Sequence, residues 1–222
     1  MEKFALFDTN MTVARDAKDI SGYVAESIRN IYGIIAEVNL GSYPGLTSKE
    51  VATEVLRKYG LSEDEISERL DRYLEDLPYS YFNVAWSDRI SVADGAKQLL
   101  DELKRKEVKI GIATGEPQRV SKMRLEKTGL LSYFTFGSYA EDGMLPKEII
   151  ESALNKVSSE FGLQASDGFF ISSFPRFIHA AKEASIYSIG VSGIYSATEL
   201  LASGADEVIK SLKEKPKAVQ KI

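Results

Sequence analysis

Cysteine is absent from this chain of 222 residues, and histidine occurs once, as His179. Without thiols the chain can form neither a disulfide framework, nor a thiolate nucleophile, nor a cysteine-based zinc site. Basic residues are not in excess either, because 28 Lys and Arg stand against 33 Asp and Glu, for a formal net charge of -5. No basic stripe is visible along the chain, so we expect no nucleic-acid partner.

Long hydrophobic runs and nucleotide-binding glycine motifs are missing as well. The first apolar run, residues 4–7, is far too short for a signal peptide or a membrane span, and no later run approaches a spanning length. We therefore expect a cytoplasmic protein with no membrane partner. Neither G-x-G-x-x-G nor G-x-x-x-x-G-K-[ST] occurs, which disfavours dinucleotide and P-loop sites.

Hydrophobic periodicity predicts helices in the N-terminal third and alternating helices and strands in the rest of the chain. After a buried strand at 4–7, apolar residues at helical spacing predict helices over 20–31, 47–59 and 62–78, the last ending at Pro78. From Val92 onward we expect strands at 108–114, 134–139, 169–172, 187–191 and 207–209, with helices at 93–106, 117–128, 146–161, 175–184 and 197–202.

Such alternation predicts right-handed crossovers and a doubly wound α/β fold, with one parallel sheet covered by helices on both faces. The first strand belongs to this sheet, whereas the helices that follow it interrupt the pattern. We therefore expect residues 1–13 and 88–222 to form an α/β core domain. Residues 14–87 are expected to form an inserted, all-helical domain.

Ligands of open α/β sheets bind outside the carboxyl ends of the strands, so the residues that end the expected strands are the candidate site. Asp8 ends the first strand and is the carboxylate there that could act as a nucleophile; its alternative role is to cap the following turn. Thr114 and Gly115 end another strand and open a helix, where a hydroxyl and free backbone N–H groups suit an anion. Ser172 and Ser173 end a third.

Taken together, the segments resemble the haloacid dehalogenase superfamily of Asp-nucleophile hydrolases, in its phosphoglycolate-phosphatase-like branch with a helical cap. The resemblance covers nearly the whole chain and implies a Rossmann-like core, a cap inserted after the first motif, and Mg²⁺ as cofactor. It rests on the segments FALFDTNMT at 4–12, GLTS at 45–48 and IATGE at 112–116, and on 122–137, 171–191 and 199–208.

The resemblance also implies roles for individual residues. Asp8 becomes the nucleophile and a metal ligand, Asn10 stands at the position of the general acid and base, and Lys147 neutralises the substrate and the nucleophile. The residues expected to contact the substrate are Thr12, Thr47, Thr114, Gly115 and Ser173.

Departures from the family pattern concern the same site. Asn10 replaces an Asp, and an amide cannot transfer the proton, a loss of about 10²–10⁴-fold in rate. The two motif-four carboxylates that hold Mg²⁺ fall on Ser173 and Phe177, which leaves Asp8 as the remaining carboxylate. We therefore expect weak Mg²⁺ binding at best, unless Glu116 or Asp142 supplies a replacement ligand. Met11 stands where the family has Gly.

We predict a phosphatase-type hydrolase in which Asp8 attacks a small phosphorylated molecule, with weak activity because the metal site is damaged. One alternative is a catalytically inactive member that binds a ligand or a protein. A less favoured one is a metal-free 2-haloacid dehalogenase, which Ser172-Ser173 resembles and from which Phe174 and Phe177 depart. The sequence is compatible with a homodimer but does not establish one.

Overall fold

The computed structural model describes residues 3–16, 20–86 and 90–220. Its described part contains a six-stranded parallel sheet in the order β5-β4-β1-β6-β7-β8, which confirms the doubly wound α/β prediction. The strands are β1 (Phe4–Phe7), β4 (Lys109–Ala113), β5 (Phe136–Ser138), β6 (Gly168–Ser172), β7 (Tyr187–Val191) and β8 (Glu207–Ile209). All lie within or close to the predicted ranges.

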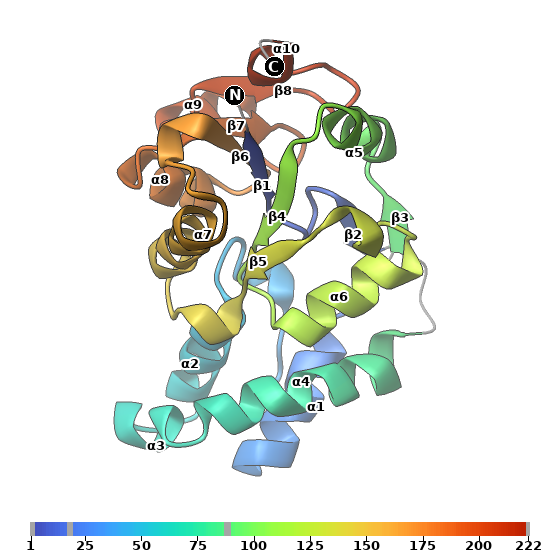
Figure 1. The fold of residues 1–222 in the computed structure, drawn as a ribbon. Coiled ribbons are helices and arrows are strands. Elements are labelled where there is room, and N and C mark those ends of the chain that lie inside the picture. Colours follow the sequence, from blue (N-terminus) through green and yellow to red (C-terminus); the bar gives the residue numbers. More distant parts are fainter. Residues whose placement is uncertain (1–2, 17–19, 87–89, 221–222) are drawn as a thin grey trace.

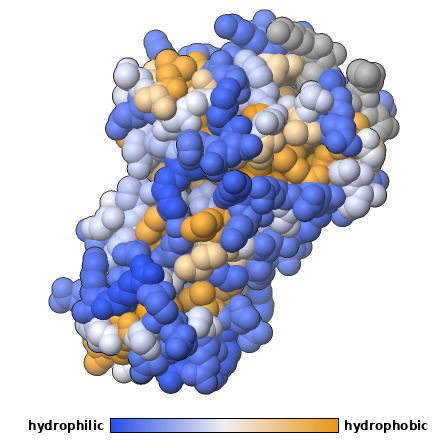
Figure 2. All heavy atoms as spheres, turned by 90° about the vertical axis from the view of Figure 1, so that its left-hand side faces the viewer, coloured by the Kyte–Doolittle hydropathy of each residue, from blue (hydrophilic) through white to orange (hydrophobic). Residues whose placement is uncertain are grey.

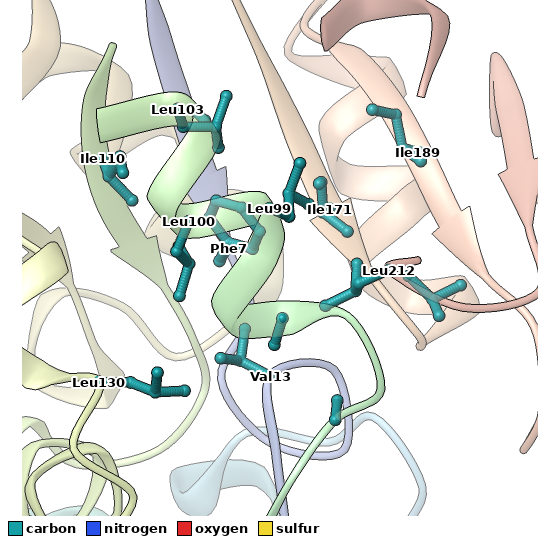
Figure 3. Close-up of a cluster of buried hydrophobic side chains, with 14 of the residues drawn as sticks. Phe7, Val13, Leu99, Leu100, Leu103, Ile110, Leu130, Ile171, Ile189 and Leu212 are labelled. Atoms are coloured by element: carbon teal, nitrogen blue, oxygen red, sulfur yellow. The ribbon is translucent and has the colours of Figure 1, made fainter. Parts of the chain in front are cut away.

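Alternating side chains of the central strand β1 enter two separate hydrophobic cores, one on each face of the sheet. Ala5 and Phe7 face the first core, which α5 (Ala96–Arg105), α6 (Gln118–Lys127) and α10 (Lys217–Gln220) cover (Figure 3). Phe4 and Leu6 face the second core, under α7 (Pro146–Phe161) and α8 (Pro175–Glu183). This period of two is what a strand buried on both faces requires. A further helix, α9 (Ala197–Ala202), packs near β8.

A layer of helices lies at the end of the sheet where β1 and β4 end (Figure 1). It comprises α1 (Ser21–Tyr32), α2 (Ser48–Lys58), α3 (Glu63–Ser67) and α4 (Leu70–Ala85). Helix α2 begins with a capping box, because Thr47 accepts from Glu50 N–H and the Glu50 side chain accepts from Thr47 N–H. These helices share a hydrophobic cluster of their own. The layer and the sheet form two lobes with a waist between them (Figure 2).

Two sequence predictions about residues 14–87 are wrong. Helix α4 does not end at Pro78 but continues to Ala85. An internal proline costs a helix about 3 kcal/mol, and the fully buried Leu77 and Tyr81 on either side offset that cost. The segment is also not all helical, because β2 (Ala14–Asp16) pairs antiparallel with β3 (Ile90–Val92). The predicted domain boundary at 87/88 lies outside the described residues.

No helix in the described parts of the chain is both long enough and apolar enough to span a bilayer.

Candidate functional site

A cavity of about 400 Å³ lies between the carboxyl ends of β1 and β4 and the helical layer. The sheet contributes four of the residues predicted from sequence, namely Asp8, Asn10, Thr114 and Gly115. The helical layer contributes mainly apolar and aromatic side chains, among them Tyr23, Val51 and Tyr73. The structure therefore brings the predicted nucleophile and its neighbours to the mouth of the parallel sheet, where ligands of such folds bind.

Asp8 is almost fully buried and is held by hydroxyl donors on both carboxylate oxygens. Thr114 Oγ1 donates to Oδ1 at 2.9 Å, and Ser172 Oγ donates to Oδ2 at 3.1 Å. Burial raises the pKa of Asp8 from 3.8 to about 7, against the lowering effect of the Thr114 hydrogen bond, and the nearby Glu116 raises it further. At neutral pH the carboxyl group is consequently poised between its ionised and protonated forms.

A short chain of hydroxyl groups connects Asp8 to Glu116. Thr9 Oγ1 lies 3.3 Å from Thr114 Oγ1 and 3.1 Å from Glu116 Oε2, within the buried interior. Burial raises the pKa of Glu116, although the charge of Arg124 opposes that rise. Each of the two hydroxyls can donate towards Asp8 or towards Glu116. A single proton, on either Asp8 or Glu116, is therefore enough for every hydrogen bond between the two carboxyl groups to have one donor and one acceptor.

Arg124 is the largest fully buried side chain, and it balances the acids around it. Its Nη1 forms an ion pair with Asp16 Oδ2 and lies 3.3 Å from Glu116 Oε1. Its Nη2 donates to Asn10 Oδ1 at 3.2 Å. Burial alone would lower the pKa of Arg124, but the two carboxylates raise it above its ordinary value, so the guanidinium stays charged.

The contact with Arg124 fixes the orientation of the Asn10 amide. Because its oxygen accepts from the guanidinium, its NH₂ group is the part left to act as a donor. Asn10 lines the cavity, so it can offer a hydrogen bond to a ligand oxygen there, although it cannot transfer a proton.

Three residues predicted to contact the substrate lie outside the residues that line the cavity. Thr12 and Ser173 are hydrogen-bonded to each other: Thr12 Oγ1 accepts from Ser173 N at 2.9 Å and lies 3.2 Å from Ser173 Oγ. They tie the loop after β1 to the loop after β6. Thr47 Oγ1 donates to the Met144 carbonyl at 2.7 Å and caps α2. In this structure these three hydroxyls are engaged within the protein.

Gly115 is needed where the two lobes meet. A Cβ at this position would lie 2.8 Å from Thr47 Cα, and the Gly115 carbonyl accepts from Ser48 N at 2.8 Å. At the helix N-terminus that follows, Gln118 N–H already donates to the Glu141 carboxylate at 3.0 Å, so this donor is not free for an anion. The expected phosphate-binding donors are therefore fewer than the sequence suggests.

Lys147 and Asp142 also lie outside the cavity lining. The side chain of Lys147 is 50% exposed, and its Nζ lies 3.9 Å from Glu183 Oε2. Asp142 pairs with Lys156 at 3.0 Å and caps Tyr139 N–H. The geometry thus gives no contact to support Lys147 as the neutralising cation or Asp142 as a metal ligand.

The residues around Asp8 do not fit Mg²⁺. Phe177 lines the cavity as an apolar ring where the family pattern has a carboxylate, and both oxygens of Asp8 already accept from hydroxyls. Within the described residues, no three His, Cys, Asp or Glu side chains gather as a metal site. A hard divalent cation requires several such oxygens free to coordinate, so we derive no step through it.

The Arg124 cluster was not anticipated from the sequence, although a signal for it was available. In α6 the buried positions Val120, Ser121, Arg124 and Leu125 share one helical face, so the arginine falls on the apolar stripe. A charge on such a face needs buried partners. The partners are Asp16, at the end of β2, and Glu116, in the loop after β4.

Comparisons with known proteins identify the family and the fold. Residues 5–191 match the family model of the haloacid dehalogenase-like hydrolases. The chain is 27% identical over 218 residues to validoxylamine A 7'-phosphate phosphatase from Streptomyces hygroscopicus subsp. limoneus, covering 96% of each protein.

Solved structures show the same fold. A predicted phosphatase from Clostridium acetobutylicum superposes with a TM-score of 0.71 at 23% identity, covering 100% of each chain. CbbY from Rhodobacter sphaeroides, solved with phosphate, superposes with a TM-score of 0.72 at 18% identity and the same coverage. A predicted phosphoglycolate phosphatase from Haemophilus somnus gives 0.70 at 14% identity, covering 96% of this chain and 95% of that one. On the extent of the family match, the chain belongs to the haloacid dehalogenase-like hydrolases.

Proposed function

We propose that this phosphatase-like hydrolase uses Asp8 as a nucleophile on a small phosphomonoester, with weak turnover that does not depend on Mg²⁺. The observation that carries the proposal is the placement of Asp8 at the end of β1, lining the cavity, with Thr114 hydrogen-bonded to it from the end of β4. The phosphatase to which the chain is 27% identical acts on a phosphate ester, which supports the same reaction class.

The reaction would proceed through a covalent intermediate. An Asp8 oxygen attacks phosphorus, and the bond from phosphorus to the alcohol oxygen breaks with its electron pair on that oxygen. Water then attacks the aspartyl phosphate, which releases inorganic phosphate and restores the carboxylate. Thr114 and Ser172 hold the carboxylate in position, and the Asn10 NH₂ group is placed to donate to a phosphate oxygen.

Two features of the site keep the proposed turnover weak. Asn10 cannot protonate the leaving group, so the alcohol must depart as an anion or take its proton from water. The acids Asp16 and Glu116 also line the cavity, and they repel a phosphate dianion. Aryl and acyl phosphates, whose leaving groups are weak bases, are therefore the expected substrates for a measurable rate.

The test is hydrolysis of an aryl phosphate and a small alkyl phosphate by the wild type and by Asp8→Asn. We expect slow release of phosphate from the aryl ester, little from the alkyl ester, and a loss of at least about 10³-fold in the variant. Equal rates in the wild type and the variant would contradict the proposal.

A second candidate function is ligand binding without catalysis. It is favoured by the closed hydroxyl network around Asp8, in which both carboxylate oxygens already accept hydrogen bonds. No phosphate release above the Asp8→Asn background, together with saturable ligand binding in the cavity, would favour this candidate.

A further inference from the structure

The charged side chains that line the cavity are all acidic among the described residues. Asp8 and Glu116 come from the ends of β1 and β4, and Asp16 comes from β2. No lysine or arginine of the described part of the chain lines this space. An anionic ligand would therefore meet carboxylates without a neighbouring cation, whereas a positively charged group would be attracted.

Arg124 does not cancel this charge. It contacts Asp16 and Glu116 but is itself absent from the cavity lining, so its guanidinium lies behind the two carboxylates. Two acids share one guanidinium, and Asp8 adds a further acidic group. Asp16 Oδ1 is buried with no described donor in hydrogen-bonding geometry, although the Tyr81 hydroxyl lies near the same carboxylate. This oxygen can accept from an N–H donor on a ligand.

A second observation, independent of the acids, points to a ligand. Tyr73 lines the cavity from α4, is fully buried, and its hydroxyl group has no hydrogen-bond partner in the described structure. Leaving a buried hydroxyl unpaired costs about 1–3 kcal/mol, which a bound polar group would recover. Most of the other lining residues are apolar or aromatic, among them Tyr23 and Phe174, and the faces of aromatic rings attract cations.

We propose that the cavity binds an organic ammonium group attached to an apolar body, through Asp16, Glu116 and Tyr73. The inference rests on the proposed function where it names the substrate class of the hydrolase. In that substrate the ammonium group belongs to the alcohol that leaves when the ester is cleaved. That charge would offset part of the repulsion that the acids exert on phosphate. Substrates whose leaving group carries a carboxylate, such as phosphoglycolate, are disfavoured by the same acids.

The inference is tested with unphosphorylated probes that match in size and differ in charge: benzylammonium, benzyl alcohol and benzoate, titrated by calorimetry into the full chain. We expect benzylammonium to bind at least about tenfold more tightly than benzyl alcohol, with no benzoate binding. Equal affinities for the three, tighter binding of benzoate, or binding of none would overturn the inference.

A pair of tyrosine variants separates recognition from folding. Tyr73→Phe removes a hydroxyl with no protein partner, so stability should not fall, whereas benzylammonium affinity should fall about threefold to tenfold. Tyr32→Phe is the control. The hydroxyl of Tyr32 donates to the Ile66 carbonyl at 2.8 Å, and Tyr32 is not among the residues that line the cavity, so stability should fall and affinity should not change. Unchanged affinity in Tyr73→Phe would overturn the role of Tyr73.

Glu116→Gln tests the contribution of charge with nearly the same shape. We expect the preference for benzylammonium over benzyl alcohol to shrink by about tenfold. An unchanged preference would contradict the inference. Because no probe carries phosphate, selective binding without phosphate release would sustain this inference and contradict the proposed hydrolysis. Phosphate release with no preference for the ammonium would do the reverse.

Discussion

The residues that follow β1 and β4 place polar side chains beside the cavity, whereas the residues that follow β6 mainly hydrogen-bond or pack within the protein. Asp8, Thr9 and Thr114 form a buried, hydrogen-bonded group beside the cavity. After β6, Ser173 bonds to Thr12, and Phe177 packs with the core under α7 and α8. The contrast teaches that neighbouring strand ends of one sheet can differ in use: two line a cavity with polar groups, and a third ties loops together and packs in the core.

Replacing Arg124 should have the largest effect on the residues beside the cavity. Arg124→Met leaves Asp16 and Glu116 buried without their counter-charge, which should lower the free energy of unfolding by about 3–5 kcal/mol. The measurement is urea unfolding. Lys122→Met, at an exposed position of the same helix, is the matched control and should change stability by less than about 0.5 kcal/mol. Similar effects of the two substitutions would contradict the buried ion cluster.

The ionisation of Asp8 should lower the free energy of unfolding as the pH rises. Its pKa is raised from 3.8 to about 7, so ionisation is costlier in the folded state than in the unfolded chain. The wild type gains its full stability from this group below pH 4 and loses it as the pH rises through about 7, a change of about 4 kcal/mol at most.

The measurement is the difference in unfolding free energy between the wild type and Asp8→Asn from pH 4 to 8. We expect the variant to become the more stable of the two as the pH increases. Stability of the wild type that rises relative to Asp8→Asn over this range would show that the carboxylate is stabilised in the fold, contrary to this account.

Met11 tests backbone strain in the loop after β1. Its φ is 57°, in the left-handed region that costs a residue with a side chain about 1–2 kcal/mol. Met11→Gly should therefore stabilise the protein by about 1 kcal/mol in thermal or urea unfolding. Ser185→Gly, at the same φ of 57° on the surface, is the comparison. A loss of stability in Met11→Gly alone would show that contacts of the Met11 side chain outweigh the strain.

Replacing Lys147 should have the smallest effect, and it tests whether this residue belongs to the site. Its exposed ion pair with Glu183 is a type worth about 1 kcal/mol or less, and it does not line the cavity. Lys147→Ala should change aryl phosphate hydrolysis by less than about twofold. A loss of tenfold or more would place Lys147 in the active site, as the family resemblance implies.

The strands and most helices were predictable because short apolar runs and helical stripes mark them directly. β1 and α7 have the predicted bounds. The continuation of α4 past Pro78 was not predictable, because it depends on packing against α1 that no local pattern shows. β2 and β3 are three residues each and pair across 76 positions, which is too little periodicity to detect.

Within the site, residue types at strand ends identified Asp8, Asn10, Thr114 and Gly115, all of which line the cavity. The sequence did not reveal that Thr12 and Ser173 hydrogen-bond to each other and do not line the cavity. Nor did it show that Asp16 and Glu116 share Arg124. Such partnerships are set by tertiary distances, and a list of polar residues does not contain them.

The proposal that most needs a test is that Asp8 acts as a nucleophile without a metal ion beside it. The direct measurement is the rate of aryl phosphate hydrolysis in EDTA and across a titration of Mg²⁺, with Asp8→Asn as the blank. We predict a slow rate that requires Asp8 and is the same in EDTA as in saturating Mg²⁺. A rate that requires Mg²⁺, or one that persists in Asp8→Asn, would contradict the account.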